Sequence, residues 1–105
     1  VIQSRDRGTV VCGVSTRHPV RVIKNQFSRD FLIKEREGLE PAELDKMGAG
    51  KYPAALKGDV KNGSLLAGQC AGLVEKIEPA ADIVQNVMET AVRILKGIGR
   101  ELCLE

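Results

Sequence analysis

The sequence predicts a single, mainly α-helical domain with one short β-strand. Its 105 residues fall within the size range of one domain. Apolar residues recur at helical spacing in residues 20–37 and 79–102, whereas only residues 9–14 form a β-branched apolar run. The content of 43% hydrophobic and 29% charged residues is that of a globular protein. Only three aromatic rings are present and Trp is absent, so the core is expected to be aliphatic.

The first elements are a strand, a polar turn and a helix. Residues 9–14 are mostly β-branched and apolar, and no second run offers them an obvious partner strand. Residues 15–19 are polar and contain Pro19, as expected of a turn. Val20 then begins an apolar pattern of helical spacing that predicts a helix to about Glu37, ended by Gly38.

Two short helices are expected next. Pro41 near the start and Glu43 in the first turn predict a helix that begins at about residue 39 and ends near Gly48. Residues 51–57 can form another turn or two, weakened by Pro53. Residues 58–63 are rich in turn formers and predict a loop.

Residues 64–74 predict a short helix of small side chains, capped by Asn62 or Ser64. In such a helix, Ser64, Gly68 and Gly72 would line one side. Each interior glycine costs about 1 kcal/mol relative to alanine, so two of them indicate close approach of a backbone or a ligand. Gln69 would need hydrogen-bond partners if buried, and either a backbone carbonyl or a ligand could supply them.

The last predicted element is a long amphipathic helix that starts at residues 78–79 and runs for about six turns. Acidic residues come early and basic residues late, as the helix dipole favours. Its wide apolar stripe requires a large surface to lie on. The stripe consists of Ile83, Val84, Val87, Met88, Ala91, Ile94, Leu95, Ile98 and Leu102.

Charge and motif content exclude several classes of function. A net charge of +2 without a concentrated basic face argues against nucleic-acid and membrane-surface binding. No apolar run reaches the ~20 residues of a membrane span, and no signal peptide begins the chain. The first residue, Val1, is not a start methionine, so we expect a piece of a longer protein.

The cysteines and the single histidine offer little catalytic chemistry. Three widely spaced cysteines without a CxxC pattern favour reduced thiols in the cytoplasm over disulfides or a metal site, and Cys12 and Cys70 lie in apolar surroundings. His18 is the only histidine, and it could be a structural turn residue or part of a site. We expect no metal site and assign no catalytic residue in this chain.

Two motifs and the final helix resemble one enzyme family. Residues 9–21 read T-V-V-C-G-V-S-T-R-H-P-V-R, and residues 58–69 read G-D-V-K-N-G-S-L-L-A-G-Q, followed by A-G-L at 71–73. These segments are similar to the FMN-dependent enoyl-acyl carrier protein reductases of the second type, relatives of the nitronate monooxygenases once called 2-nitropropane dioxygenases. The sequence departs from the family pattern at Cys12 and Val14, and at Arg17, where the family usually has glycine.

The resemblance implies that residues 1–105 are a C-terminal subdomain normally attached to a TIM-like (β/α)8 flavin barrel, which this chain lacks. It implies FMN held mainly by the barrel, NAD(P)H as reductant, and an enoyl substrate on acyl carrier protein. The subdomain would cover the active site and shape the acyl pocket, and a homodimer is possible. Gln69, Gly68 and Ser64 would contact the cofactor, and His18 and Asn62 the substrate. The alternatives are a nitronate monooxygenase on the same scaffold and a stand-alone helical interaction module.

Overall fold

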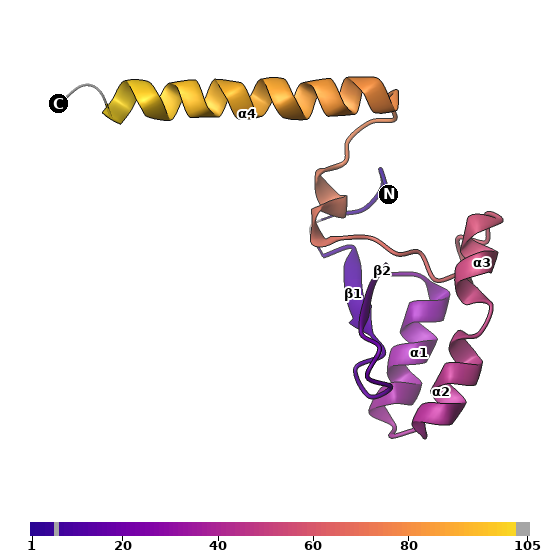
Figure 1. Ribbon diagram of the computed structural model, residues 1–105. Coiled ribbons are helices and arrows are strands. Elements are labelled where there is room, and N and C mark those ends of the chain that lie inside the picture. The colour runs from indigo at the N-terminus through magenta and orange to yellow at the C-terminus, as the bar shows by residue number, and fades with distance from the viewer. Residues whose placement is uncertain (6, 103–105) are drawn as a thin grey trace. The chain divides into compact units, whose positions relative to one another are not determined.

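The structure is a computed structural model that describes residues 1–5 and 7–102, with the backbone alone for residues 99–102. Within these residues the order of elements is β1, β2, α1, α2, α3, the 3-10 helix η1 and α4 (Figure 1). The prediction of a mainly helical fold is confirmed. The chain divides into two units, Val1–Glu75 and Lys76–Glu105. Cys103 lies outside the described residues.

Strand β1 (Thr9–Cys12) pairs antiparallel with β2 (Val20–Ile23), in the register Thr9↔Ile23 to Cys12↔Val20. The predicted strand therefore exists and has a partner within the chain. The prediction that a helix begins at Val20 is wrong. The sequence Val-Arg-Val-Ile is rich in β-branched residues, and pairing with β1 places Val22, 1% exposed, in the core. Hydrogen bonding to β1 therefore makes these residues a strand, although their apolar spacing also fits a helix.

Helix α1 (Gln26–Arg36) begins where Asn25 supplies an N-cap. The Ser28 backbone N–H donates to Asn25 Oδ1 at 3.0 Å, and the Asn25 backbone N–H donates to Ser28 Oγ at 2.9 Å. Asn25 Nδ2 also donates to the carbonyls of Val60 at 3.0 Å and Gly63 at 2.7 Å. One side chain therefore starts the helix and fixes the loop of residues 60–63 beside it.

The core of the first unit lies between the strand pair, α1 and α2 (Pro41–Gly48). The rings of Phe27 and Phe31 meet edge to face with centroids 5.7 Å apart. The short helix α3 (Lys51–Leu56) follows α2, so the predicted positions of both short helices are confirmed. The buried apolar cluster comprises Cys12, Val22, Phe27, Phe31 and Leu44.

The helix predicted for residues 64–74 does not form. Residues 65–67 run antiparallel along the free edge of β2, where the Ile23 N–H donates to the Leu65 carbonyl at 2.8 Å and the Ala67 N–H to the Arg21 carbonyl at 3.1 Å. The 3-10 helix η1 (Gln69–Leu73) follows. This pairing provides hydrogen-bond partners for backbone N–H and C=O groups at the edge of β2. Because Gly68 does not lie inside an α-helix, the cost of an interior helical glycine does not apply to it.

Close backbone approach, expected at Gly68, is found at Gly63 instead. A Cβ added to Gly63 would lie 2.5 Å from the Asp59 carbonyl oxygen and 2.7 Å from the backbone of Ala55 in α3. The same addition at Gly68 would meet nothing closer than 3.4 Å. Gly63 is therefore the glycine on which the packing of this loop against α3 depends.

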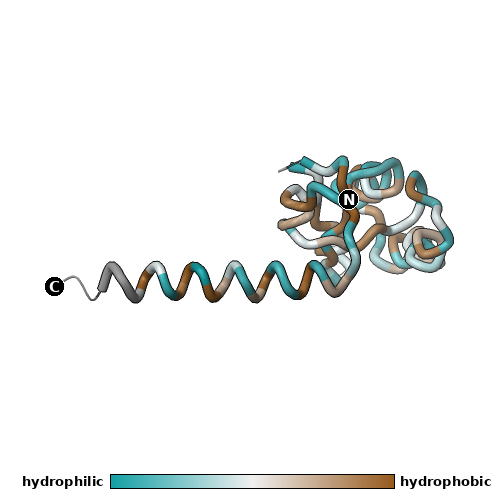
Figure 2. Tube along the Cα trace, turned by 90° about the horizontal axis from the view of Figure 1, so that it is seen from above, coloured by the Kyte–Doolittle hydropathy of each residue, from teal (hydrophilic) through white to brown (hydrophobic). Residues whose placement is uncertain are grey.

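Helix α4 (Ala80–Leu102) belongs to the second unit and confirms the predicted long final helix. Apolar and polar residues alternate along it with helical period (Figure 2). Among the described residues, no helix combines the length and the apolar character that crossing a membrane requires.

Candidate functional site

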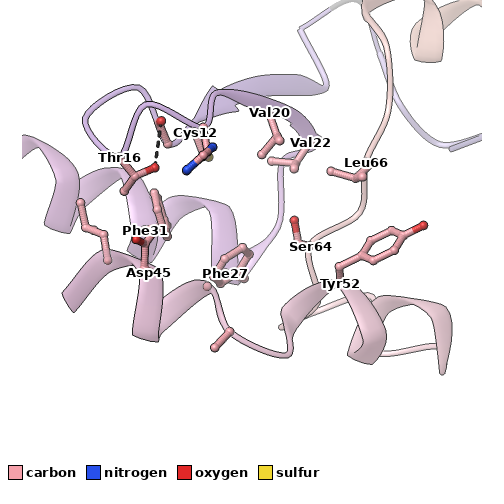
Figure 3. Close-up of a pocket in the computed structure, with 15 residues that line it drawn as sticks. Cys12, Thr16, Val20, Val22, Phe27, Phe31, Asp45, Tyr52, Ser64 and Leu66 are labelled. Carbon is pink, nitrogen blue, oxygen red and sulfur yellow. Dashed lines mark hydrogen bonds between the residues drawn. The ribbon is translucent and has the colours of Figure 1, made fainter. Parts of the chain in front are cut away.

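The first unit contains a cavity of about 410 Å³, opening among β1, β2, the loop between them, α1, α2 and residues 64–66 (Figure 3). A volume of this size suits a small organic ligand or part of a larger one. The cavity is lined by Cys12, Gly13, Thr16, His18, Val20, Val22, Phe27, Phe31, Leu44, Asp45, Gly48, Ala49, Tyr52, Ser64 and Leu66.

The inner wall of the cavity is apolar because the core residues themselves form it. Phe27, Phe31 and Leu44 are each less than a tenth exposed and meet Val22 there. Burial, and secondly the negative charge of Glu35, raise the pKa of the Cys12 thiol to about 11. Cys12 is therefore a neutral thiol at physiological pH and contributes another apolar surface.

Polar groups enter the cavity lining from four segments. Thr16 and His18 come from the β1–β2 loop, Asp45 from α2, Tyr52 from α3, and Ser64 from the position that precedes the extended segment 65–67. The Ser64 N–H donates to the Lys51 carbonyl at 2.8 Å, which ties that segment to α3. In the part of the chain that the structure describes, no lysine or arginine belongs to the lining. Such a site can bind an apolar chain or ring and donate hydrogen bonds to a neutral polar group.

The loop that carries His18 is built around Gly13. The Gly13 carbonyl accepts from the His18 N–H and from Thr16 Oγ1, both at 3.1 Å. A Cβ on Gly13, whose φ is +82°, would lie 2.6 Å from the His18 carbonyl oxygen. Arg17, with φ of 62°, is the only non-glycine residue with positive φ among the described residues. The family's glycine would suit this left-handed position without strain.

Glu35 of α1 holds the start of the same loop. Its carboxylate accepts from the Ser15 N–H at 2.9 Å, from Ser15 Oγ at 2.8 Å and from the Gly13 N–H at 3.3 Å. Burial alone would raise the pKa of Glu35, but these hydrogen bonds outweigh burial and hold the pKa below its ordinary value. The ionised carboxylate therefore anchors the His18 loop on α1.

The structure brings together two of the five residues that the sequence analysis assigned to binding. His18 and Ser64 both line the cavity. Asn62, Gly68 and Gln69 are exposed and lie outside the cavity lining. The Asn62 N–H donates to Asp59 Oδ1 at 2.9 Å in the loop, and no helix N-terminus is present there to receive a ligand.

Three polar cavity residues were missed by the sequence analysis, namely Thr16, Asp45 and Tyr52. Thr16 belongs to the motif of residues 9–21 but was not singled out there. Nothing in the local sequence marks Asp45 and Tyr52, because each enters the site through the packing of its own helix. The apolar surroundings expected for Cys70 are not found, since that residue is exposed. Within the described residues, no three His, Cys, Asp or Glu side chains are grouped as a metal site would require.

Neither a protein-family model nor a curated protein matches the chain. Among solved structures, the fold resembles the type II enoyl-acyl carrier protein reductases, and the resemblance given by the sequence motifs is confirmed. FabK from Thermotoga maritima matches 92% of this chain with 33% identity and a TM-score of 0.77. A point mutant of the same protein matches 92% of the chain with 29% identity and a TM-score of 0.68.

The chain spans about one third of the length of FabK: the matches cover 32% of the FabK chain and 29% of the mutant chain. The resemblance to FabK concerns the fold of the matched third.

The cavity is suited to only part of the flavin that the resemblance implies. The phosphate of FMN is anionic, and among the described residues no lysine or arginine lines the cavity to receive it. The apolar wall and the hydroxyl and imidazole groups suit a ring edge or an acyl chain instead. The lining residues therefore suit a ring edge or an acyl chain, but not the phosphate of FMN.

Proposed function

We propose that this chain forms the part of an FMN-dependent enoyl-acyl carrier protein reductase that covers the active site and shapes the acyl pocket. The observation that carries the proposal is the similarity to FabK over 92% of the chain. The cavity supports it, because an apolar wall with polar groups from four segments suits an acyl chain that ends in a thioester. In this proposal the protein acts in the cytoplasm.

When bound, FMN would accept a hydride from NAD(P)H and deliver it to the enoyl group. The residues of this chain would contribute binding and orientation. Phe27, Phe31 and Leu44 would pack against the acyl chain and exclude water. His18 and Ser64 would donate hydrogen bonds to polar atoms of the substrate or cofactor, from positions fixed by Gly13 and by the Lys51 carbonyl.

Asn62, Gly68 and Gln69 are exposed and lie outside the cavity lining. They would contact the flavin or the substrate where it extends beyond the cavity. The Gln69 side chain is exposed, and its amide can both donate to and accept from a ligand. The backbone at Gly68 is exposed and has no side chain to keep a flavin ring away.

A chimera tests the proposal. This chain would replace the matched third of Thermotoga FabK, and the parent protein would serve as the positive control. We expect a flavin-loaded protein that oxidises NAD(P)H only when a crotonyl thioester is present. A folded, flavin-loaded chimera that turns over an alkyl nitronate but not the thioester would replace the reductase with the nitronate monooxygenase alternative. A folded chimera that lacks flavin and both activities would contradict the proposal.

A matched pair of substitutions tests the role of the cavity. Ala49→Phe would fill it from the end of α2, whereas Ala42→Phe places the same ring on the same helix away from the lining. We expect Ala49→Phe to raise KM for a long-chain thioester at least about tenfold, the equivalent of about 1.4 kcal/mol, with flavin binding unchanged. Equal effects of the two substitutions would show that the cavity does not hold the acyl chain.

A further inference from the structure

A second hollow lies in the first unit, separate from the cavity described above. It has a volume of about 630 Å³, and Arg5, Arg7 and Lys24 bring three cationic side chains into its lining. We call it the basic hollow, after these three residues. Among the residues that the structure describes, no aspartate or glutamate belongs to the lining. The basic hollow is therefore suited to an anion, whereas the apolar cavity is not.

Backbone hydrogen bonds hold the two arginines beside the lysine. The Gly8 N–H donates to the Arg5 carbonyl at 2.7 Å, and the Lys24 N–H donates to the Gly8 carbonyl at 2.8 Å. A Cβ on Gly8 would lie 2.9 Å from the Arg5 carbonyl oxygen, so the turn there is too tight for a larger residue. The segment that carries Arg5 and Arg7 is thereby joined to the end of β2, where Lys24 follows.

The positive charge of the basic hollow exceeds the nearby negative charge. Asp6 lies between the two arginines in the sequence and outside the described residues. Even with its charge counted, residues 5–7 and Lys24 together carry a net charge of +2. Gln3 and Ser4 add an amide and a hydroxyl to the lining, and both groups can donate hydrogen bonds to an oxyanion.

The two arginines are accessible from more than one side. Arg5 and Arg7 are exposed, and together with Ser4 and Gly72 they also line a neighbouring hollow of about 580 Å³. Figure 1 shows the N-terminal segment passing beside η1, which contains Gly72. An anion can therefore reach both guanidinium groups from solvent without any movement of the core.

The basic hollow and the apolar cavity lie on opposite faces of β2. The two share no lining residue among those described. Val22 lines the cavity and Ile23 lines the basic hollow, because successive side chains of a strand point to opposite faces. Leu66 and Leu65 of the extended segment divide between the two sites in the same way. A group bound in the basic hollow is therefore held apart from a chain or ring in the cavity.

A phosphate group matches the donors of the basic hollow. Guanidinium groups form paired hydrogen bonds with phosphate oxygens, and such charge-assisted bonds are stronger than neutral ones. A concave site also favours a small molecule over the surface of an acidic protein. We propose that the basic hollow binds the phosphate group of a small molecule, held by Arg5, Arg7 and Lys24.

The phosphate can come from a nucleotide or from free inorganic phosphate. Within the proposed function the nucleotide would be NADPH, whose adenosine carries a 2′-phosphate that NADH lacks. Only this assignment rests on the proposed function. The site itself rests on the charges and the lining of the basic hollow, so the two can fail independently.

NMR titration of the isotope-labelled 105-residue chain tests the site. The probes are inorganic phosphate and adenosine 2′-monophosphate, with adenosine as the uncharged control. We expect both phosphate probes to shift the amide signals of Ser4, Gly8 and Lys24, and to leave those of Thr16 and His18 at the cavity unchanged. Adenosine alone should shift none of them. Absence of shifts at the basic hollow with both phosphate probes would overturn the proposal.

A matched pair of double substitutions separates the basic hollow from general positive charge. Arg5→Gln with Arg7→Gln should weaken binding of both phosphate probes at least about tenfold, because each lost charge-assisted hydrogen bond contributes about 1.5–3 kcal/mol. The control, Arg29→Gln with Arg36→Gln, removes the same charge from exposed positions of α1 and should preserve binding. Equal weakening in the two double variants would contradict a built site. The titration of the unsubstituted chain decides the question even if a variant does not fold.

The two sources of the phosphate give different results. Tighter binding of adenosine 2′-monophosphate than of inorganic phosphate would identify a nucleotide, and equal binding would identify free phosphate. For a nucleotide, Arg5→Gln with Arg7→Gln in the chimera with FabK should raise KM for NADPH and leave KM for NADH unchanged. An equal rise in both KM values would overturn the assignment to NADPH. Phosphate binding by the isolated chain, together with a folded but inactive chimera, would count against the proposed function alone.

Discussion

Replacing Glu35 with glutamine should loosen the loop that carries His18. Glu35 accepts hydrogen bonds from the Ser15 N–H, from Ser15 Oγ and from the Gly13 N–H at 2.9, 2.8 and 3.3 Å. A hydrogen bond to a charged group contributes about 1.5–3 kcal/mol, and the low end applies to a half-buried carboxylate. The glutamine amide retains one acceptor oxygen. We therefore expect Glu35→Gln to lower the free energy of unfolding by about 1–2 kcal/mol at pH 7.

The pH dependence of this effect has a defined sign. The pKa of Glu35 is lower in the folded protein than its ordinary value of 4.5, so the folded state binds the proton less tightly than the unfolded state. The stabilisation is fully present above that ordinary value and is lost as the pH falls through the lower pKa of the folded state. The difference between wild type and Glu35→Gln should therefore shrink on acidification below pH 4.5.

Urea denaturation followed by circular dichroism, repeated from pH 7 to pH 3, measures this prediction. The control is Glu37→Gln, which makes the same change of charge on an exposed residue that pairs with Lys34 at 2.7 Å. Exposed ion pairs contribute about 0–1 kcal/mol to stability, so Glu37→Gln should lower the free energy of unfolding by less than Glu35→Gln does. The reasoning would be refuted if the two variants lost the same free energy of unfolding at pH 7. It would also be refuted if the loss caused by Glu35→Gln did not decrease at low pH.

Three further substitution and reactivity experiments follow from the same unit. Arg17→Gly should raise the free energy of unfolding, measured by a denaturation curve, by about 0.5–1 kcal/mol. Glycine removes the backbone strain of a left-handed residue, and this gain exceeds the cost of the greater conformational entropy that glycine gives the unfolded chain. Gly63→Ala should lower stability by about 3 kcal/mol or more, whereas the control Gly48→Ala, whose new Cβ would meet nothing closer than 3.9 Å, should change it by less than about 1 kcal/mol. At pH 8, iodoacetamide should modify the exposed Cys70 and spare Cys12, whose pKa is about 11, and equal labelling by mass spectrometry would contradict this.

Sequence patterns correctly predicted the helices that depend on interactions between residues close together in the chain. Pro41 and Glu43 indicate the start of α2, and the dipole charges and apolar period indicate α4, so both helices lie where they were predicted. Residues 20–23 carry a pattern that fits either a helix or a strand. The strand forms because β1, which precedes it by one loop, and the distant residues 65–67 pair with its two edges, and the local apolar pattern shows neither pairing.

The candidate site was only partly accessible to sequence reasoning. The sequence motifs indicated His18 and Ser64. These two residues are 46 positions apart in the sequence, and both line the same cavity in the structure. Tyr52 and Asp45 reach the same cavity through the packing of α2 and α3. Glu35 and Asn25 look like ordinary helix residues in the sequence, but in the structure they fix the two loops beside the site.

The sequence by itself determined the helical class of this protein, the amphipathic final helix and the resemblance to one reductase family, because composition, apolar period and motifs are properties of residues close together in the chain. Only the tertiary structure decided that Val20–Ile23 is a strand, that residues 65–67 extend along it, and that Gly63 rather than Gly68 is the close contact. These features depend on backbone hydrogen bonds and contacts between distant segments, and their free energy exceeds the small differences in local propensity.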